Sequence, residues 1–179
     1  MFPRLITQDN QPSLAAVIAN GMLFNISWLA IVYSHSLLFA PIVAALHLLI
    51  HFALMGRGLV EARLILGVSV LGFALDQAVF TAGVLSASGP YSVAPIWISC
   101  LWPVLATTLM HAFSALQKRL LLAAIIGGVG GMASYVAGAR LSDVEFVSPF
   151  WGPVTMALIW FVVFPLLLLA ARLNSESDI

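Results

Sequence analysis

The chain has 179 residues, of which 62% are hydrophobic and only 8% are charged, and its mean hydropathy is +1.08. Soluble proteins are about one quarter charged, so this composition excludes a soluble catalytic domain and predicts a polytopic membrane protein. Seven basic residues balance seven acidic ones, which excludes the basic surface that a nucleic-acid-binding protein needs. The single cysteine, Cys100, excludes an intrachain disulfide and any multi-cysteine metal or iron–sulfur site.

Six apolar segments approach or exceed the length of about 20 residues that a helix needs to cross the hydrocarbon core. In chain order they cover residues 14–33, 36–55, 59–85, 96–116, 120–139 and 149–172. Pro12-Ser13 is a start signal for the first helix, and Gly56-Arg57-Gly58 separates the second from the third. The segments 86–95 and 140–148 are expected to be loops. The first span is too long for the apolar region of a signal peptide and lacks a cleavage site, so we expect it to be retained.

Basic residues near the ends of the spans predict the orientation, because they favour the cytoplasmic side. With both termini inside, only Arg140 lies outside, and the cytoplasmic basic residues are Arg4, Arg57, Arg63, Lys118, Arg119 and Arg172. The sequence therefore predicts an all-α bundle of six transmembrane helices with both termini cytoplasmic. Its parts are an N-terminal segment (1–13), a single transmembrane domain (14–172) and a C-terminal tail (173–179).

An aspartate, Asp76, lies within the third span. An ionised carboxylate at this depth costs about 2.5–3.5 kcal/mol, so we expect it to face a partner or a cavity. Aromatic residues gather in the same outer half: Trp28, Tyr33, Tyr91, Trp97, Trp102, Tyr135, Phe150 and Trp151. A membrane-surface aromatic belt accounts for them, but a belt usually decorates both interfaces. We favour an outward-facing pocket with Asp76 and Asn25 at its floor, and its predicted ligand-binding residues are Asn25, Asp76, Trp97, Trp102 and Tyr135.

A second polar cluster is predicted in the inner half, comprising His47, His51, Glu61, Thr107 and His111. His47 and His51 share a helix face at i, i+4 spacing, and Thr107 and His111 share another. Such histidines can ligate a metal or a haem, but no glutamate lies between His47 and His51 as the HExxH zinc motif requires. We favour histidines that hydrogen-bond between helices and predict no metal and no cofactor. A proton relay between this cluster and Asp76 remains an alternative.

Small residues form a stripe on the fifth span, at Ala123, Gly127, Gly131, Ser134 and Gly138. A second stripe, on the third span, comprises Ala62, Ser69, Gly72, Asp76 and Gly83. Membrane helices pack closely where small residues let their backbones approach. Packing within one bundle is the simpler explanation, and docking of a membrane protein partner or a second copy through Gly127 and Gly131 is the alternative. Pro103 and Pro165 lie inside the fourth and sixth spans and remove a backbone donor from each.

Several elements in combination resemble one family. They are Asn25-Ile26-Ser27-Trp28, His47, Glu61, Asp76, Pro95-Ile96-Trp97, Leu101-Trp102, Thr107-Thr108 and the run GGMASYVAGARL. Over nearly its whole length the chain is similar to small proteobacterial inner-membrane proteins grouped as domain of unknown function 2878. It departs from their pattern at Gly131-Met132 and Leu141-Ser142-Asp143, away from the polar positions. The resemblance implies a bacterial inner membrane, a six-span bundle, a lipid-related role suggested by neighbouring genes, and interest in Asn25, Glu61, Asp76, Trp97 and Trp102.

Three functions fit these features. The first, which we favour, is binding or transport of a small, partly apolar molecule, lipid-like or vitamin-like, at the outward-facing site. In size and topology the chain resembles the substrate-binding subunits of energy-coupling-factor vitamin transporters, and Ala15 and Ala19 have the spacing of a docking stripe. The second is a membrane-embedded enzyme or accessory subunit in lipid modification, with Asp76 or His111 as acid or base. The third is a scaffold with structural polar residues. Membrane lipids are expected partners in each case.

Overall fold

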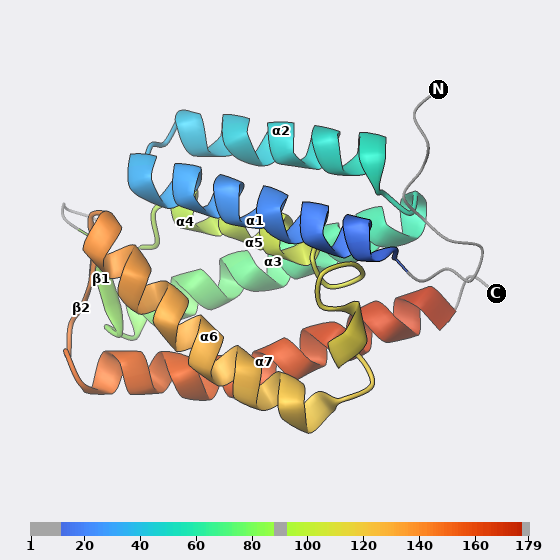
Figure 1. The fold of residues 1–179 in the computed structure, drawn as a ribbon. Coiled ribbons are helices and arrows are strands. Elements are labelled where there is room, and N and C mark those ends of the chain that lie inside the picture. Colours follow the sequence, from blue (N-terminus) through green and yellow to red (C-terminus); the bar gives the residue numbers. More distant parts are fainter. Residues whose placement is uncertain (1–11, 88–92, 177–179) are drawn as a thin grey trace.

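The computed structural model describes residues 12–87 and 93–176, and these residues form a bundle of helices (Figure 1). The helices are α1 (Leu14–Ser34), α2 (Phe39–Leu54), α3 (Leu59–Thr81), α4 (Ile96–Ser99), α5 (Leu101–Ala106), the 3-10 helix η1 (Ser114–Leu116), α6 (Leu120–Leu141) and α7 (Trp151–Glu176). The predicted helical fold is therefore confirmed. The predictions for Arg4 and Tyr91 fall outside the described residues.

Within the described ranges, four helices are long and apolar enough to cross a membrane, namely α1, α3, α6 and α7. The side chain of Ser13 accepts a hydrogen bond from the Ala16 N–H at 3.1 Å, which confirms the predicted start of α1. Gly58 precedes α3 with a φ of +76°, a conformation that glycine adopts without strain. The helix α2 and the α4–α5 segment are apolar but shorter.

The segment 96–116 is not the single helix that the sequence predicts. It contains α4, α5 and then a run of turns over residues 107–113 that leads into η1. Pro103 has no N–H to donate to the Ser99 carbonyl, and the helix is interrupted between these two residues. The hydroxyls of Thr107-Thr108 bond to backbone carbonyls three residues earlier, at 2.7 and 2.6 Å, and such bonds compete with regular helix. The prediction of an uninterrupted fourth span is therefore wrong.

The helices α6 and α7 form the most extensive pair in the bundle. A Cβ atom on Gly127 would lie 2.5 Å from Cβ of Phe164, and one on Gly131 would lie 2.3 Å from the ring of Trp160. The small-residue stripe of α6 therefore contacts α7 of the same chain, as packing within one bundle predicts. Pro165 lies inside α7, which continues on both sides of it.

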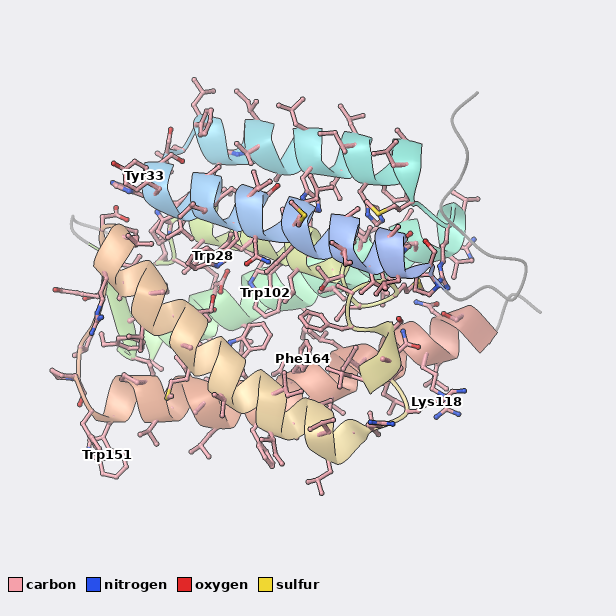
Figure 2. All side chains as sticks on the ribbon, in the orientation of Figure 1. Trp28, Tyr33, Trp102, Lys118, Trp151 and Phe164 are labelled. Carbon is pink, nitrogen blue, oxygen red and sulfur yellow. The ribbon has the colours of Figure 1, made fainter. Side chains whose placement is uncertain are left out.

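α3 ends at Thr81, before the predicted end of the third span at residue 85, so Gly83, with a φ of +69°, lies outside this helix and not on its predicted small-residue stripe. Two short strands join the segments that follow α3 and α6. β1 (Leu85–Ala87) pairs antiparallel with β2 (Val144–Phe146). The start of α1 and the end of α7 lie at the opposite end of the bundle from these strands (Figure 1). Lys118 lies at the end where α1 starts, whereas Tyr33 and Trp151 lie at the strand end (Figure 2). At this end of the bundle, the pairing of β1 with β2 holds the α3–α4 connection against the α6–α7 connection.

The bundle has polar side chains in its interior and large apolar side chains on its surface. The buried polar residues are Asn20, Ser27, His47, His51, Glu61, Asp76, Thr107, Thr108 and His111. On the outside, Leu49, Leu121 and Leu158 are 67%, 73% and 65% exposed. A helix bundle surrounded by lipid has this distribution, because lipid covers apolar side chains and offers polar ones no partner.

Candidate functional site

Asp76 on α3 is 2% exposed, and side chains from the neighbouring helices bind its carboxylate. Ser99 Oγ and Trp102 Nε1 each donate a hydrogen bond to its Oδ2 at 2.9 Å. Tyr135 of α6 also interacts with this carboxylate. Trp102 packs directly over Gly72, one turn before Asp76, where a Cβ atom would lie 1.8 Å from the indole ring. Side chains from α4, α5 and α6 thus converge on one buried carboxylate of α3.

A pocket of about 230 Å³ lies between α1, α4, α5, α6 and α7. Aromatic rings form much of its wall, and they include Phe24, Trp28, Trp97, Trp102, Tyr135 and Trp160. Trp102 and Trp160 stack, with ring centroids 5.4 Å apart and ring planes inclined by 10°. Trp28, Trp102 and Phe164 lie in the interior of the bundle (Figure 2). The pocket can therefore hold an apolar group of a ligand against flat aromatic surfaces.

Glycines of α6 create the space for this pocket. Gly130 and Gly138 line it, and a Cβ atom at either position would meet nothing within 4 Å. Gly127 and Gly131 also line it, but they lie against α7. Since Ile126 and Gly130 are exposed on the outside of the bundle, the pocket opens toward the surface that would face lipid.

The predicted ligand-binding residues do not all come together. Trp97, Trp102 and Tyr135 line the pocket. Asp76 is not a lining residue, but it accepts a hydrogen bond from Trp102, which is. Asn25 lies on the exposed side of α1, where its amide donates to the Gly21 carbonyl at 2.7 Å, and it is not among the lining residues. The structure therefore does not place Asn25 at the pocket floor with Asp76.

The predicted aromatic group divides into two sets. Trp28, Trp97, Trp102 and Tyr135 line the pocket, whereas Tyr33, Phe150 and Trp151 are 71%, 65% and 65% exposed at the strand end. The exposed set is what an interfacial belt requires. The pocket therefore accounts for one part of the predicted aromatic group, and the interfacial belt accounts for the other.

Sequence reasoning missed four aromatic residues of the wall: Phe24, Phe113 and, on α7, Trp160 and Phe164. The two on α7 lie opposite the α6 glycines, Trp160 against Gly131 and Phe164 against Gly127. Large residues spaced four apart on one span, facing small residues spaced four apart on the preceding one, are the signal that could have found them.

In the cluster that the sequence assigned to the inner half, His47 is held between Ser27 of α1 and Thr107 of the turn segment. Its Nδ1 lies 2.9 Å from Ser27 Oγ, and its Nε2 lies 2.9 Å from Thr107 Oγ1. Because the Thr107 hydroxyl donates its own proton to the Val104 carbonyl, it accepts from Nε2. The Ser27 hydroxyl then donates to Nδ1, so both ring nitrogens of His47 are satisfied.

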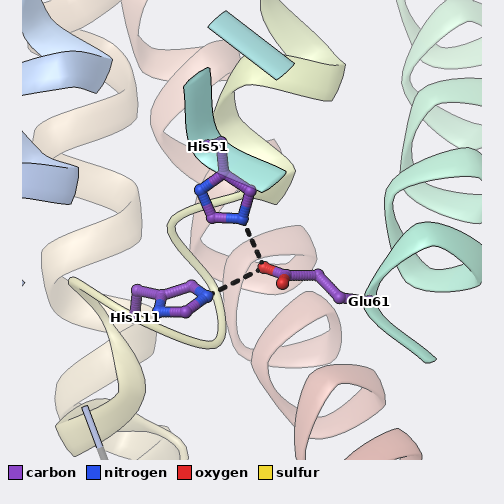
Figure 3. A group of neighbouring side chains, drawn as sticks. All are labelled: His51, Glu61 and His111. Carbon is purple, nitrogen blue, oxygen red and sulfur yellow. Dashed lines mark hydrogen bonds and ion pairs between the residues drawn. The ribbon is translucent and has the colours of Figure 1, made fainter. Parts of the chain in front are cut away.

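The rest of the inner cluster centres on Glu61. The Nε2 atoms of His51 and His111 lie 2.9 and 3.0 Å from its Oε1 (Figure 3). Its other oxygen, Oε2, accepts the backbone N–H of Arg57 at 2.8 Å. All three side chains of this group have 0% exposure. Burial lowers the pKa of the Arg57 guanidinium, which lies between α2 and α3, and the negative charge of Glu61 opposes that shift.

The inner cluster and the Asp76 site are separate in their hydrogen bonding. The structure brings together all five residues that the sequence assigned to the inner cluster, with Asn20 and Ser27 in addition. Among the described residues, none of these side chains bonds to Asp76 or to its partners Ser99 and Trp102. The proton relay between the two regions therefore gains no support from direct contacts.

Comparison with known proteins identifies a family and no individual relative. Neither a curated protein nor a solved structure shows significant similarity to this chain. The family described as "Protein of unknown function (DUF2878)" matches residues 17–166, a range that contains the pocket and the inner cluster. Over most of its length, therefore, this chain belongs to the DUF2878 family.

Proposed function

We propose that this protein binds a small, partly apolar, lipid-like molecule in the pocket beside Asp76. The observation that carries the proposal is the pocket of about 230 Å³ walled by aromatic rings and helix glycines. Pockets for small molecules are lined mainly by apolar and aromatic side chains with a few polar groups that fix orientation. Here Tyr135 and Ser134 supply polar groups at the wall.

An unpaired donor in the wall indicates what the ligand offers in return. Among the described residues, Trp97 Nε1 is a buried N–H group without a hydrogen-bond partner. A buried donor left unpaired costs about 1–3 kcal/mol. A carbonyl or phosphate oxygen on the ligand would satisfy such a donor, so we expect a molecule with an apolar chain and acceptor oxygens.

We further propose that the chain crosses a bacterial inner membrane six times, with both termini cytoplasmic. In this topology α2 and the α4–α5 segment are shorter traverses beside the four long helices. The 16 residues of α2 extend about 24 Å, somewhat less than the hydrocarbon thickness of about 30 Å. The location of Lys118 at the end where α1 starts and α7 ends supports a cytoplasmic assignment for that end. The pocket then lies toward the outer side.

Filling the pocket tests the ligand proposal. Gly130→Leu adds a side chain at a position that lines the pocket, where a Cβ atom would meet no other atom within 4 Å. Gly67→Leu is the matched control, because Gly67 is also a helical glycine with open space around it and lies on α3 away from the pocket. Native mass spectrometry of each protein, purified in mild detergent, is expected to show a defined lipid adduct on the wild type and on Gly67→Leu. Gly130→Leu should lose it.

Two results would contradict the proposal. One is an adduct that survives on folded Gly130→Leu with unchanged occupancy. The other is the absence of any defined adduct from wild-type protein that remains folded, even after incubation with an extract of bacterial membrane lipids. Asp76→Asn adds a third comparison: because Asn keeps an oxygen acceptor for Ser99 and Trp102, we expect a folded protein with weaker adduct retention.

A further inference from the structure

We propose that His51, Glu61 and His111 form a binding site for one divalent transition-metal ion. Three different parts of the chain supply the donor atoms: α2, the first turn of α3 and the turns after α5 (Figure 3). The three atoms, two imidazole nitrogens and one carboxylate oxygen, all lie within 4.8 Å of one another. This site lies in the inner cluster and does not depend on the ligand proposed for the pocket.

Two of the three spacings between the donor atoms fit one face of an octahedron, and the third, between the two Nε2 atoms, lies within 4.8 Å. Ligand atoms about 2.1 Å from a metal and at right angles to each other are about 3.0 Å apart. Glu61 Oε1 lies 2.9 Å from His51 Nε2 and 3.0 Å from His111 Nε2, so two edges of the face already have this length. Hydrogen bonds alone have the same spacing. An ion bound here would take the place of the two hydrogen-bonded protons, and the three donor atoms already meet at one buried point.

The other oxygen of Glu61 is fixed independently. Its Oε2 accepts the Arg57 N–H at 2.8 Å, which orients the carboxylate and leaves Oε1 directed at the two histidines. Groups that bind the far side of a metal ligand in this way hold it in position and commonly change metal affinity by about 10–100-fold when they are removed.

The neighbours of the two imidazoles permit the required tautomers. Ligation through Nε2 leaves the proton on Nδ1, and Asn20 lies 3.4 Å from Nδ1 of His51. Rotation of the Asn20 amide would present its oxygen to that proton. The rotation gives up two long contacts of 3.3 Å, to the Thr107 carbonyl and from the Ala112 N–H. His111 Nδ1 is buried without a partner among the described residues, so only the bond from Nε2 to Glu61 fixes the tautomer, and an ion at Nε2 would replace that bond.

The donor set favours a particular class of ion. Two imidazoles with one carboxylate suit Fe²⁺, Zn²⁺, Co²⁺ or Mn²⁺, whereas Mg²⁺ and Ca²⁺ prefer all-oxygen sites. A divalent cation also offsets the charge of Glu61, which at 0% exposure has no contact with solvent. The non-helical backbone at residues 107–113 carries His111 to this site, and irregular backbone at membrane depth occurs only where protein buries it or it lines a cavity.

Cobalt(II) is the probe for this site, because its visible absorption reports imidazole and carboxylate ligation directly. Protein purified in detergent without a polyhistidine tag is stripped with a chelator and titrated with Co²⁺. We expect the wild type to bind one equivalent with a new absorption band. Glu61→Gln and His111→Gln should each weaken binding by more than about tenfold. His47→Gln is the matched buried control, and His35→Gln controls for binding at the surface; both should retain the band.

Stoichiometric binding on the wild type decides the proposal even where a variant fails to fold. One equivalent of Zn²⁺ should displace the cobalt band and raise the melting temperature of the wild type, since an ion that binds only the native state stabilises it. Folded wild-type protein that takes up no cobalt would overturn the proposal. So would a band that persists in folded Glu61→Gln and His111→Gln, or one that is lost equally in folded His47→Gln or His35→Gln.

Discussion

The inner cluster and the Asp76 site both bury charged groups, but they pair them differently. In the inner cluster, side chains from α1, α2, α3 and the turns bond chiefly to one another, and His47 has both ring nitrogens satisfied. At the other site a single carboxylate takes hydrogen bonds from Ser99 and Trp102, and aromatic rings beside it enclose a pocket.

The difference shows that burial of a charge does not by itself indicate what a region can bind. The inner cluster gathers polar atoms at one point and suits a small ion. The Asp76 site has one acid, a stacked tryptophan pair and glycines that keep space open, so it suits a larger and mostly apolar molecule. Substitutions that remove donors should therefore damage the first region most, and substitutions that add volume should damage the second.

The largest expected effect comes from removing the donors around Glu61. Replacing both His51 and His111 by Leu leaves a buried carboxylate without its two side-chain donors. We expect the free energy of unfolding to fall by about 3–5 kcal/mol, because an uncompensated charge remains buried. Adding Glu61→Leu should recover much of this loss, since an apolar replacement of the whole set removes the charge. Unfolding in detergent measures all three proteins, and a triple variant no more stable than the double one would show that the charge is not the cause.

A smaller effect is expected from adding one methyl group beneath Trp102. The Cβ atom of Gly72→Ala would lie 1.8 Å from the indole ring, so Trp102 must move and its bond to Asp76 is strained or lost. We expect a loss of about 1–3 kcal/mol in the free energy of unfolding. Gly67→Ala is the control, because open space surrounds Gly67 on the same helix and alanine favours helix. Equal stability of the two variants would contradict the close packing of Trp102.

The smallest effect is expected at Asn25, the predicted site residue that the structure separates from the pocket. Its side chain is exposed and bonds to its own helix at Gly21. Asn25→Ala should change the free energy of unfolding by less than about 0.5 kcal/mol and leave lipid adducts in native mass spectra unchanged. A lost adduct on the folded variant would show that α1 presents Asn25 to the ligand.

Local sequence signals predicted the starts of the long helices well, because the start of a helix depends on residues close to it in the chain. The cap at Ser13 and the glycines on both sides of Arg57 determine where α1 and α3 begin. The i, i+4 spacing of His47 and His51 likewise placed both on one buried face. Periodicity along a helix therefore gave the faces correctly.

The sequence did not predict features that depend on how separate helices pack against one another. The depth argument placed Asn25 near the level of Asp76, but depth does not give direction around a helix, and the side chain is exposed. The turns at residues 107–113 begin at Thr107 and Thr108, whose hydroxyls bond to the backbone, and membrane helices tolerate such residues elsewhere. The approach of His111 to Glu61 follows from these turns, so composition and hydropathy could not predict it.

The break in the fourth segment also has a consequence for the order of assembly. The Ala112 N–H bonds to Asn20 of α1, and Asn20 also donates to the carbonyl of Thr107. In lipid these backbone groups have no alternative partner outside a regular helix. The turns can therefore reach their native form only after α1 is already beside them, so we expect this part of the chain to mature after insertion, with the first helix serving as its template.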